Sequence, residues 1–279
     1  MHTCHNLAQW RAYRSGINTE SLGFVPTMGN LHDGHLALVK QAKAENDHVA
    51  VSIFINPIQF NDSEDFASYP RTLEQDLAAL EGLADAVFCP SEELLYPTSH
   101  STIVEVTKLS DILQGEVRAG HFRGVATVVT KLLNIVRADR AYFGLKDYQQ
   151  VTVLKRLAQD LFIDTEIIAC PTIRDSDGLA LSSRNQRLST EQRAAAVIIP
   201  KALDHAQTLP RDSVAKIVRE FLSQEPLAEV VSVDVRDAKT LEEYTENSAS
   251  AVLLLAVRFG DVLLIDLALL KHEKDHETH

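Results

Sequence analysis

The sequence predicts an α/β fold in which a doubly wound parallel sheet is followed by a smaller α+β domain. Short apolar runs alternate with amphipathic runs in the first part of the chain, which is typical of strands that alternate with helices. The run at 49–55 is apolar almost throughout, as expected for a strand buried on both faces of a parallel sheet. After Pro171 the pattern changes to helices followed by three strands, which predicts the second domain.

The elements of the first domain follow from the spacing of the apolar residues. A helix is predicted at 6–14, and the apolar run that ends at Pro26 predicts a strand at 22–26. Pro57 cannot donate a hydrogen bond to a sheet, so the chain leaves the sheet there. We further expect helices at about 34–46, 73–82 (capped by Thr72), 122–137 and 148–159, strands at 86–88, 103–106, 141–143 and 163–169, and loops at 61–70 and 114–120. This order predicts a Rossmann-like sheet with right-handed crossovers, in which ligands bind at the carboxyl ends of the strands.

The second domain is expected to contain two long helices and a small sheet. We place the domains at 1–174 and 175–279, with the boundary in the polar segment 172–185. The charged tail at 271–279 is expected to fray. The predicted elements are helices at 190–207 and 212–223 and strands at 230–236, 251–258 and 261–266, the last two joined as a hairpin at Phe259-Gly260-Asp261.

Composition and charge narrow the class of protein. The 279 residues are 45% hydrophobic and 24% charged, which is ordinary for a globular protein. The net charge of −12 disfavours a broad surface for nucleic acid or an anionic membrane. Cys4, Cys89 and Cys170 form no disulfide or metal pattern, which indicates a reducing compartment. With no signal peptide and no apolar run long enough to span a bilayer, we expect a cytoplasmic protein.

The sequence His32-Asp33-Gly34-His35 follows the first predicted strand and a turn that contains Gly29. A helix start presents unpaired N–H groups and partial positive charge, which suits a phosphate. Two imidazoles three residues apart can both donate hydrogen bonds to phosphate oxygens. Alternatively, both histidines are surface residues that cap a helix, and composition alone does not separate the two interpretations.

Two further turns carry groups suited to anions. In the turn at 144–150, Lys146 can neutralise a phosphate, Asp147 can cap the next helix, and Gln150 can hold a carboxylate or hydroxyl. The segment at 181–185 places two hydroxyls before a guanidinium, which makes a flexible anion clamp. Each segment alone is more simply explained as a polar turn or linker. Three such turns in one α/β chain favour a nucleotide phosphate site.

Six motifs together resemble the pantothenate synthetase (pantoate–β-alanine ligase) family of the HIGH-motif nucleotidyltransferase superfamily. The motifs occur in family order and cover 22–190 densely, whereas the C-terminal domain matches more loosely. They lie at 26–35, 54–60, 69–71, 121–125, 144–150 and 177–185. The resemblance implies that the pantoate carboxylate attacks the α-phosphate of Mg-ATP. The β-alanine amine then attacks the pantoyl adenylate, giving pantothenate and AMP.

The resemblance also implies a role for individual residues. Those implied in catalysis are His35, His32, Lys146 and Arg184. The ATP site is implied at Met28, Gly29, Asn30, Leu31, His32, Asp33, Gly34, His35, Gly144, Leu145, Lys146, Asp147, Ile173, Leu181, Ser182, Ser183 and Arg184. Gln59 and Gln150 are expected to hold pantoate, and Gln59 is also expected to contact β-alanine. Asn56 and Tyr69 are expected to line the site of the small substrates. Asp76 is expected to help to hold Mg²⁺, and Arg118 is expected to lie behind the site or at an interface.

The resemblance further implies a homodimer formed through the larger domain. We also expect the boundary at 172–185 to act as a hinge, so that the smaller domain closes Ser182 to Arg184 over ATP as a lid. Asn30, Leu145 and Leu181 depart from the usual family residues, but none of them replaces a charged group. Histidines and a cysteine near the two ends (His2, Cys4, His5, His272, His276, His279) are expected in mobile termini, where a specific metal role is discounted.

Three other classes compete with this interpretation. A simple adenylyl- or cytidylyltransferase shares the histidine motif, but the motif at 54–60 and the Gln149–Gln150 pair argue against it. A tRNA-charging enzyme needs an RNA surface that the acidic composition disfavours. A nucleotide-binding module without catalysis is disfavoured because the histidine, lysine, serine and arginine motifs are intact.

Overall fold

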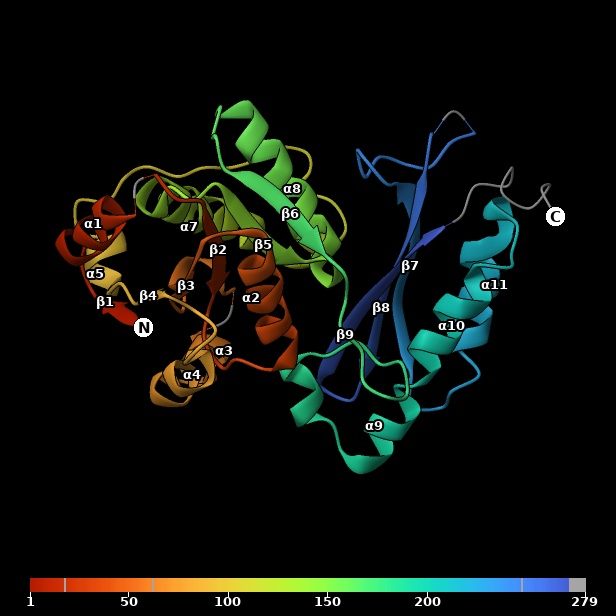
Figure 1. Cartoon of the computed structure of the whole chain (residues 1–279). Coiled ribbons are helices and arrows are strands. Elements are labelled where there is room, and N and C mark those ends of the chain that lie inside the picture. Colours follow the sequence, from red (N-terminus) through yellow and green to blue (C-terminus); the bar gives the residue numbers. More distant parts are fainter. Residues whose placement is uncertain (18, 62, 247, 271–279) are drawn as a thin grey trace. The chain divides into compact units, whose positions relative to one another are not determined.

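The computed structural model describes residues 1–17, 19–61, 63–246 and 248–270, and the chain divides into two compact units (Figure 1). The first unit comprises Met1–Leu145 and Gln149–Pro171, and the second comprises Lys146–Tyr148 and the chain from Thr172 onward. The tail at 271–279, with His272, His276 and His279, lies outside the described residues.

The first unit is built on a six-stranded sheet whose strands pair in parallel, and the sequence predicts this parallel arrangement. Its strand order is β1-β4-β3-β2-β5-β6, so β2 lies between β3 and β5. The order reverses across β2 and β5, and in such sheets ligands bind outside the carboxyl ends of the strands at this switch point. The strands are β1 (His2–Cys4), β2 (Leu22–Thr27), β3 (His48–Ile53), β4 (Ala86–Phe88), β5 (Arg140–Gly144) and β6 (Glu166–Cys170).

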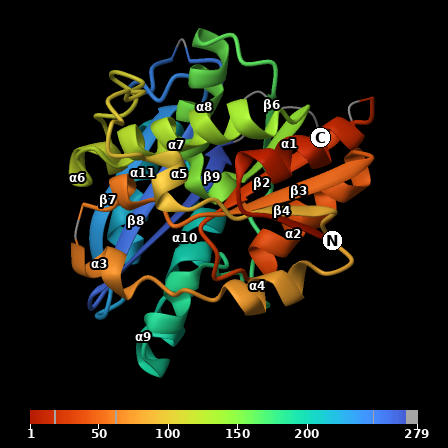
Figure 2. The same ribbon diagram turned by 90° about the vertical axis from the view of Figure 1, so that its left-hand side faces the viewer.

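Helices cover both faces of this sheet. Side chains alternate between faces along a strand, so Phe24 joins the core on one face while Val25 joins the core on the other. The Phe24 core is completed by α1 (Leu7–Gly16), α7 (His121–Val136) and α8 (Tyr148–Asp160), and the Val25 core by α2 (Asp33–Glu45) and α4 (Leu73–Leu80). Figure 2 shows α1 and α7 on one side of these strands and α2 and α4 on the other.

The second unit contains a three-stranded antiparallel sheet in the order β7-β8-β9. Gly260 has a φ of 59° in the turn between β8 and β9, which confirms the predicted hairpin. Two helices pack along the sheet, and their apolar residues form one core with it (Figure 1). The elements are α9 (Thr190–Ala195), α10 (Ile198–Ala206), α11 (Arg211–Leu222), β7 (Glu229–Asp237), β8 (Ala251–Phe259) and β9 (Val262–Leu270).

Several local predictions are wrong. The expected loops at 61–70 and 114–120 contain the short helices α3 (Ser63–Ser68) and α6 (Gln114–Val117), and α5 (Glu92–Leu95) also forms. The helix expected at 190–207 is interrupted between α9 and α10, because Pro200 has no N–H and is tolerated only in the first turn of α10. The strand expected at 103–106 is absent from this described stretch, where the Thr127 side chain bonds both the N–H and the carbonyl of Val104.

The N-terminus is ordered, contrary to the prediction that it is mobile. His2–Cys4 forms β1, which pairs in parallel with β4, and Cys4 is buried. Three residues are too few for a periodic pattern, so β1 is recognised only from its pairing. No helix within the described ranges is long and apolar enough to cross a membrane.

Candidate active site

The histidine pair lies where β2 ends and α2 begins. His32 is the residue before α2, and His35 lies in its first turn. Their ring centroids are 4.1 Å apart. β2 is the strand at the switch point of the sheet, so both predicted histidines meet at the N-terminus of a helix on its ligand-binding edge.

Hydrogen bonds at this helix start determine which ring nitrogen carries the proton. The Gly34 N–H donates to His32 Nδ1 at 3.1 Å, and the His32 N–H donates to His35 Nδ1 at 3.4 Å. An accepting nitrogen is unprotonated, so each neutral ring carries its proton on Nε2. Nε2–H is the group that can donate to a phosphate oxygen. Capping the helix and binding phosphate are therefore compatible, because they use different nitrogens.

The turn before the histidines is held by a buried carboxylate. Gly29 and Asn30 have φ values of 80° and 52°. The N–H groups of Asn30 and Leu31 donate to Asp76 Oδ2 and Oδ1 at 3.0 and 2.8 Å. Contrary to the prediction, Thr72 does not cap α4 with its side chain; its hydroxyl donates to Asp76 Oδ2 instead, at 3.1 Å.

The Mg²⁺ role of Asp76 stays a prediction, and the observed hydrogen bonds do not fit it. Asp76 is 3% exposed, and both its oxygens face N–H or O–H hydrogens, which a cation does not tolerate. Within the described part of the chain, no group of three or more histidine, cysteine or acidic side chains is placed to hold a metal ion.

Gln59 lies at the end of η1 (Pro57–Gln59), a 3₁₀ helix that follows β3. Its Nε2 donates to the Met28 sulfur at 3.0 Å, which links it to the histidine turn. Its Oε1 accepts from Asn56 Nδ2 at 2.9 Å. Two predicted site segments, after β2 and β3, are therefore in contact.

Buried groups behind Gln59 hold its position. Asn56 is 1% exposed, and its amide also bonds the Gly124 carbonyl at 3.1 Å and the Tyr96 hydroxyl at 2.7 Å. Burial raises the pKa of Tyr96, so this hydroxyl stays protonated and donates. His121 Nδ1 lies 2.9 Å from the Gln59 carbonyl oxygen. Asn56 thus positions Gln59, and its direct contact with a substrate stays a prediction.

The turn after β5 carries the second predicted motif. Gly144 ends β5, and η2 (Leu145–Asp147) leads into α8. The Lys146 side chain is largely covered and lies 3.7 Å from an Asp147 carboxylate oxygen. Gln149 is buried and donates to the carbonyls of Leu109 and Ile112, which makes it structural. Gln150, one residue on, is half-buried and stays the predicted pantoate ligand.

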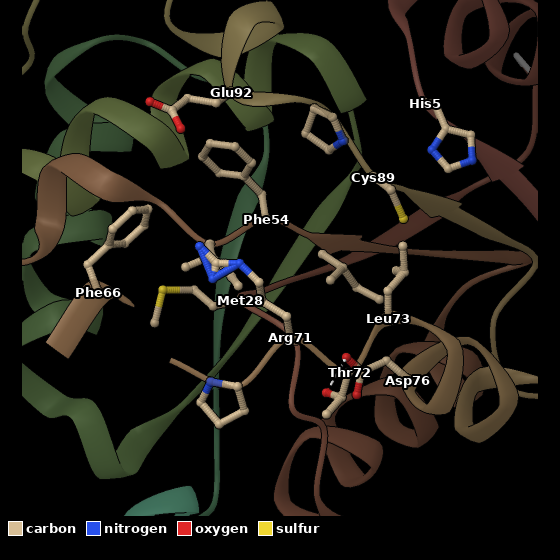
Figure 3. Close-up of a pocket in the computed structure, with 15 residues that line it drawn as sticks. His5, Met28, Phe54, Phe66, Arg71, Thr72, Leu73, Asp76, Cys89 and Glu92 are labelled. Carbon is tan, nitrogen blue, oxygen red and sulfur yellow. Dashed lines mark hydrogen bonds between the residues drawn. The ribbon is translucent and has the colours of Figure 1, made fainter. Parts of the chain in front are cut away.

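A cavity of about 310 Å³ lies beside the histidine turn (Figure 3). Met28, Gly29, Arg71 and Cys89 are among its lining residues. Burial raises the pKa of the Cys89 thiol to about 11, so it stays protonated at neutral pH and is no nucleophile. Tyr69 packs edge-on to Phe60, 5.6 Å between ring centroids, and its role toward small substrates stays a prediction.

The third motif belongs to the second unit. Ser182 caps η3 (Ser183–Arg187), where its hydroxyl accepts from the Arg184 N–H at 3.3 Å. The Leu181 N–H donates to the Ile173 carbonyl, which joins two predicted ATP contacts. Upstream, Arg174 makes two hydrogen bonds to the buried Asp266, at 2.6 and 3.0 Å. The anion clamp at 181–185 is thus attached to a loop that the Arg174–Asp266 pair holds in place.

Arg193→Gln is expected to loosen the loop at 174–181. Arg193 pairs with Asp175 and Asp177 at 2.8 and 2.7 Å, and its hydrogen bond lowers the pKa of Asp177. A carboxylate whose pKa is lower in the folded protein than in the unfolded chain stabilises the fold at pH values above its unfolded pKa. The pairing with Arg193 is therefore present at neutral pH and is lost below about pH 4. The protection factors of the amides in this loop, which are corrected for the intrinsic exchange rate at each pH, should fall about two- to fivefold in the variant at pH 7, and in the wild type only in acid. Exposed Lys201 provides the control, Lys201→Gln; equal exchange in both variants contradicts the prediction.

The first unit therefore has the features of an α/β protein that binds an anionic ligand at the carboxyl edge of a parallel sheet. These features are the parallel sheet and the histidine pair at its switch point.

The chain belongs to the pantoate-beta-alanine ligase family, whose model matches residues 1–269. It is 50% identical to the pantothenate synthetase of Rhizobium rhizogenes strain K84 over 278 residues, 95% of each chain. It is 50% identical to that of Agrobacterium fabrum strain C58 over 266 residues, 92% of this chain and 91% of the relative. The family predicted from the motifs is confirmed.

Solved structures of pantothenate synthetases have the same fold as this chain. Pantothenate synthetase from Thermus thermophilus has a TM-score of 0.90 at 41% identity, covering 96% of this chain and 99% of its own. The enzyme from Francisella tularensis, in complex with beta-gamma ATP and beta-alanine, has a TM-score of 0.80 at 39% identity, covering 96% of this chain and 97% of its own. The predicted fold class is confirmed.

Proposed function

We propose that this chain joins pantoate to β-alanine at the expense of ATP, through a pantoyl adenylate. Its family supports this activity, and the Francisella relative was crystallised in complex with beta-gamma ATP and beta-alanine. Within the chain, the observation that carries the proposal is the histidine pair at the switch point, with Nδ1 of each ring committed to the helix start.

In the first step, a pantoate carboxylate oxygen bonds to the α-phosphorus of ATP, and the bond to pyrophosphate breaks. His32 and His35 donate from Nε2 to phosphate oxygens, where negative charge grows in the transition state. The N–H groups at the start of α2 add their partial positive charge. No protein nucleophile is needed, because positioning and charge stabilisation suffice.

Gln59 and Gln150 hold pantoate in this proposal. The link from Gln59 to Met28 supports it, because pantoate bound at Gln59 is then beside the turn that binds ATP. In the second step, the β-alanine amine bonds to the acyl carbon, AMP leaves, and the amine loses a proton. Gln59 also contacts β-alanine.

The second unit supplies the remaining phosphate ligands in this proposal. Lys146, Ser182, Ser183 and Arg184 carry the donors and positive charge suited to the β- and γ-phosphates. We propose domains at 1–174 and 175–279, the smaller one closing as a lid that keeps water from the labile adenylate. Attachment of the clamp loop through Arg174 supports this role.

Three further features belong to the proposal. Mg²⁺ accompanies ATP, held mainly by phosphate oxygens and water, which is its usual mode in nucleotide sites. The active form is a homodimer in contact through the larger domain. The location is cytoplasmic, which the three buried free cysteines support.

The test mixes the protein with Mg-ATP, pantoate and β-alanine and follows AMP and pyrophosphate. We expect AMP formation that requires both small substrates. Pyrophosphate release with a phosphorylated acceptor alone indicates a simple nucleotidyltransferase and contradicts the proposal. Tight ATP binding without turnover indicates a module that has lost catalysis.

A further inference from the structure

We propose that Asp76 is a positioning residue for the reaction: it fixes the turn that places His32 and His35. This inference rests on the proposed function for its kinetic test. It differs from the metal role that the family resemblance implies for the same carboxylate.

The Asp76 carboxylate reaches the turn directly from α4. It accepts the N–H groups of Asn30 and Leu31 on separate oxygens, at 3.0 and 2.8 Å. A third donor, the Thr72 hydroxyl, bonds Asp76 Oδ2 at 3.1 Å and so helps to orient the carboxylate. Figure 3 shows the two side chains together. With 3% of Asp76 exposed, water does not replace these bonds.

The turn needs such a support because its backbone is strained. Asn30 has a φ of 52° directly after Gly29 at 80°, so two successive residues are left-handed. A non-glycine residue keeps this conformation only where its surroundings impose it. A Cβ added at Gly29 would lie 2.9 Å from Asp76 Oδ2, so the carboxylate also packs against this turn.

The position of the turn is transmitted to the histidines through one peptide bond. Leu31, held by Asp76 Oδ1, directly precedes His32. The His32 N–H in turn donates to His35 Nδ1. A shift of the turn therefore displaces both imidazoles, and displacements of about 1 Å can cost 10²-fold in rate.

Asp76→Asn tests the role, since the amide is isosteric but has only one acceptor oxygen. In either amide orientation, an NH₂ group faces at least one N–H of the turn. We expect kcat to fall about 10- to 100-fold, with the Mg²⁺ concentration for half-maximal rate unchanged within about twofold. Glu74→Gln removes an exposed charge from the same helix and should leave kcat unchanged. Should Asp76→Asn not fold, Asp76→Glu gives the same test, because it displaces the carboxylate by one methylene.

Two readouts separate positioning from other roles. If Asp76 acts through the histidines, its loss adds little to the loss in a His35→Asn background; fully multiplicative effects overturn the proposal. Recovery of kcat at high Mg²⁺ indicates a metal ligand and also overturns it. A lowered melting temperature with unchanged kcat indicates a structural role only and also overturns the proposal.

The imidazole resonances test the proposal without any turnover. The His32 and His35 ring signals should shift in Asp76→Asn and not in Glu74→Gln. Unchanged signals overturn the positioning role. If the ring signals shift in Asp76→Asn but the wild type makes no pantothenate, the positioning role stands and only the proposed function is refuted.

Discussion

Replacing His35 with alanine is expected to lower kcat/KM for adenylate formation about 10²- to 10³-fold. The variant loses the Nε2–H donor at the helix start, where charge develops on the α-phosphate. The fold should survive, because α2 is held by the buried residues Leu38, Val39 and Ala42. The lost capping bond to the His32 N–H should cost about 1 kcal/mol of stability. Pyrophosphate release and thermal unfolding measure the two effects separately.

Two replacements of His35 separate its nitrogens. Asparagine keeps an acceptor near the Nδ1 position but has no group at Nε2, so His35→Asn should be as impaired as alanine with better stability. Glutamine places an N–H near Nε2, so His35→Gln should retain more activity. Lys40→Ala, an exposed change on the same helix, is the control. Near-normal turnover by His35→Asn would show that the imidazole does not stabilise the transition state.

Gly124→Ala is expected to lower kcat/KM for pantoate about 10²-fold by displacing Gln59. A Cβ at Gly124 would lie 2.4 Å from the Ile58 carbonyl oxygen and 2.6 Å from Gln59 Cα, both backbone atoms of η1. Alanine normally favours a helix over glycine by about 1 kcal/mol. Here the clash reverses the sign, and we expect the free energy of unfolding to fall about 1–3 kcal/mol.

Gly16→Ala is the matched control for this prediction. Gly16 ends α1, and among the described residues no heavy atom outside its chain neighbours and its own helix backbone lies within 4 Å of the position where its Cβ would be. The substitution should leave stability equal or higher and activity unchanged. Steady-state kinetics with varied pantoate and denaturant unfolding distinguish the variants. If Gly124→Ala behaves like Gly16→Ala, the packing of α7 on η1 does not position Gln59.

Much of the fold is predictable from the sequence because its signals are local. Apolar runs such as 49–55 predict buried parallel strands without knowledge of their partners, and β3 confirms this one. The loops are predicted less well, since α3 and α6 are single turns or little more, with too few residues for a periodic pattern. β1 is also too short to show a periodic pattern, and it is recognised as a strand only from its pairing with β4.

The candidate site likewise has residues that a local motif predicts and residues whose role depends on contacts between distant segments. The histidine motif is visible in the sequence, because a strand, a glycine turn and a helix start occur in one short segment. The groups that hold the histidine turn and Gln59 in place are not visible in the sequence, because Asp76 is 45 residues from Leu31 and Asn56 is 68 residues from Gly124. One signal for Gly124 does exist: a glycine inside a strongly apolar helix is unfavourable unless something packs closely against it.

The sequence by itself determined the class of fold, the strand ends where chemistry occurs, and the family. These follow from periodicity and contiguous motifs, which depend on neighbouring residues. Only the tertiary structure decided that Asp76 supports the histidine turn, that Gln149 is structural, and that Asn56 and Gly124 set the position of Gln59. The physical reason is that a buried hydrogen bond or a close packing contact depends on where distant segments meet, and no local pattern encodes that meeting.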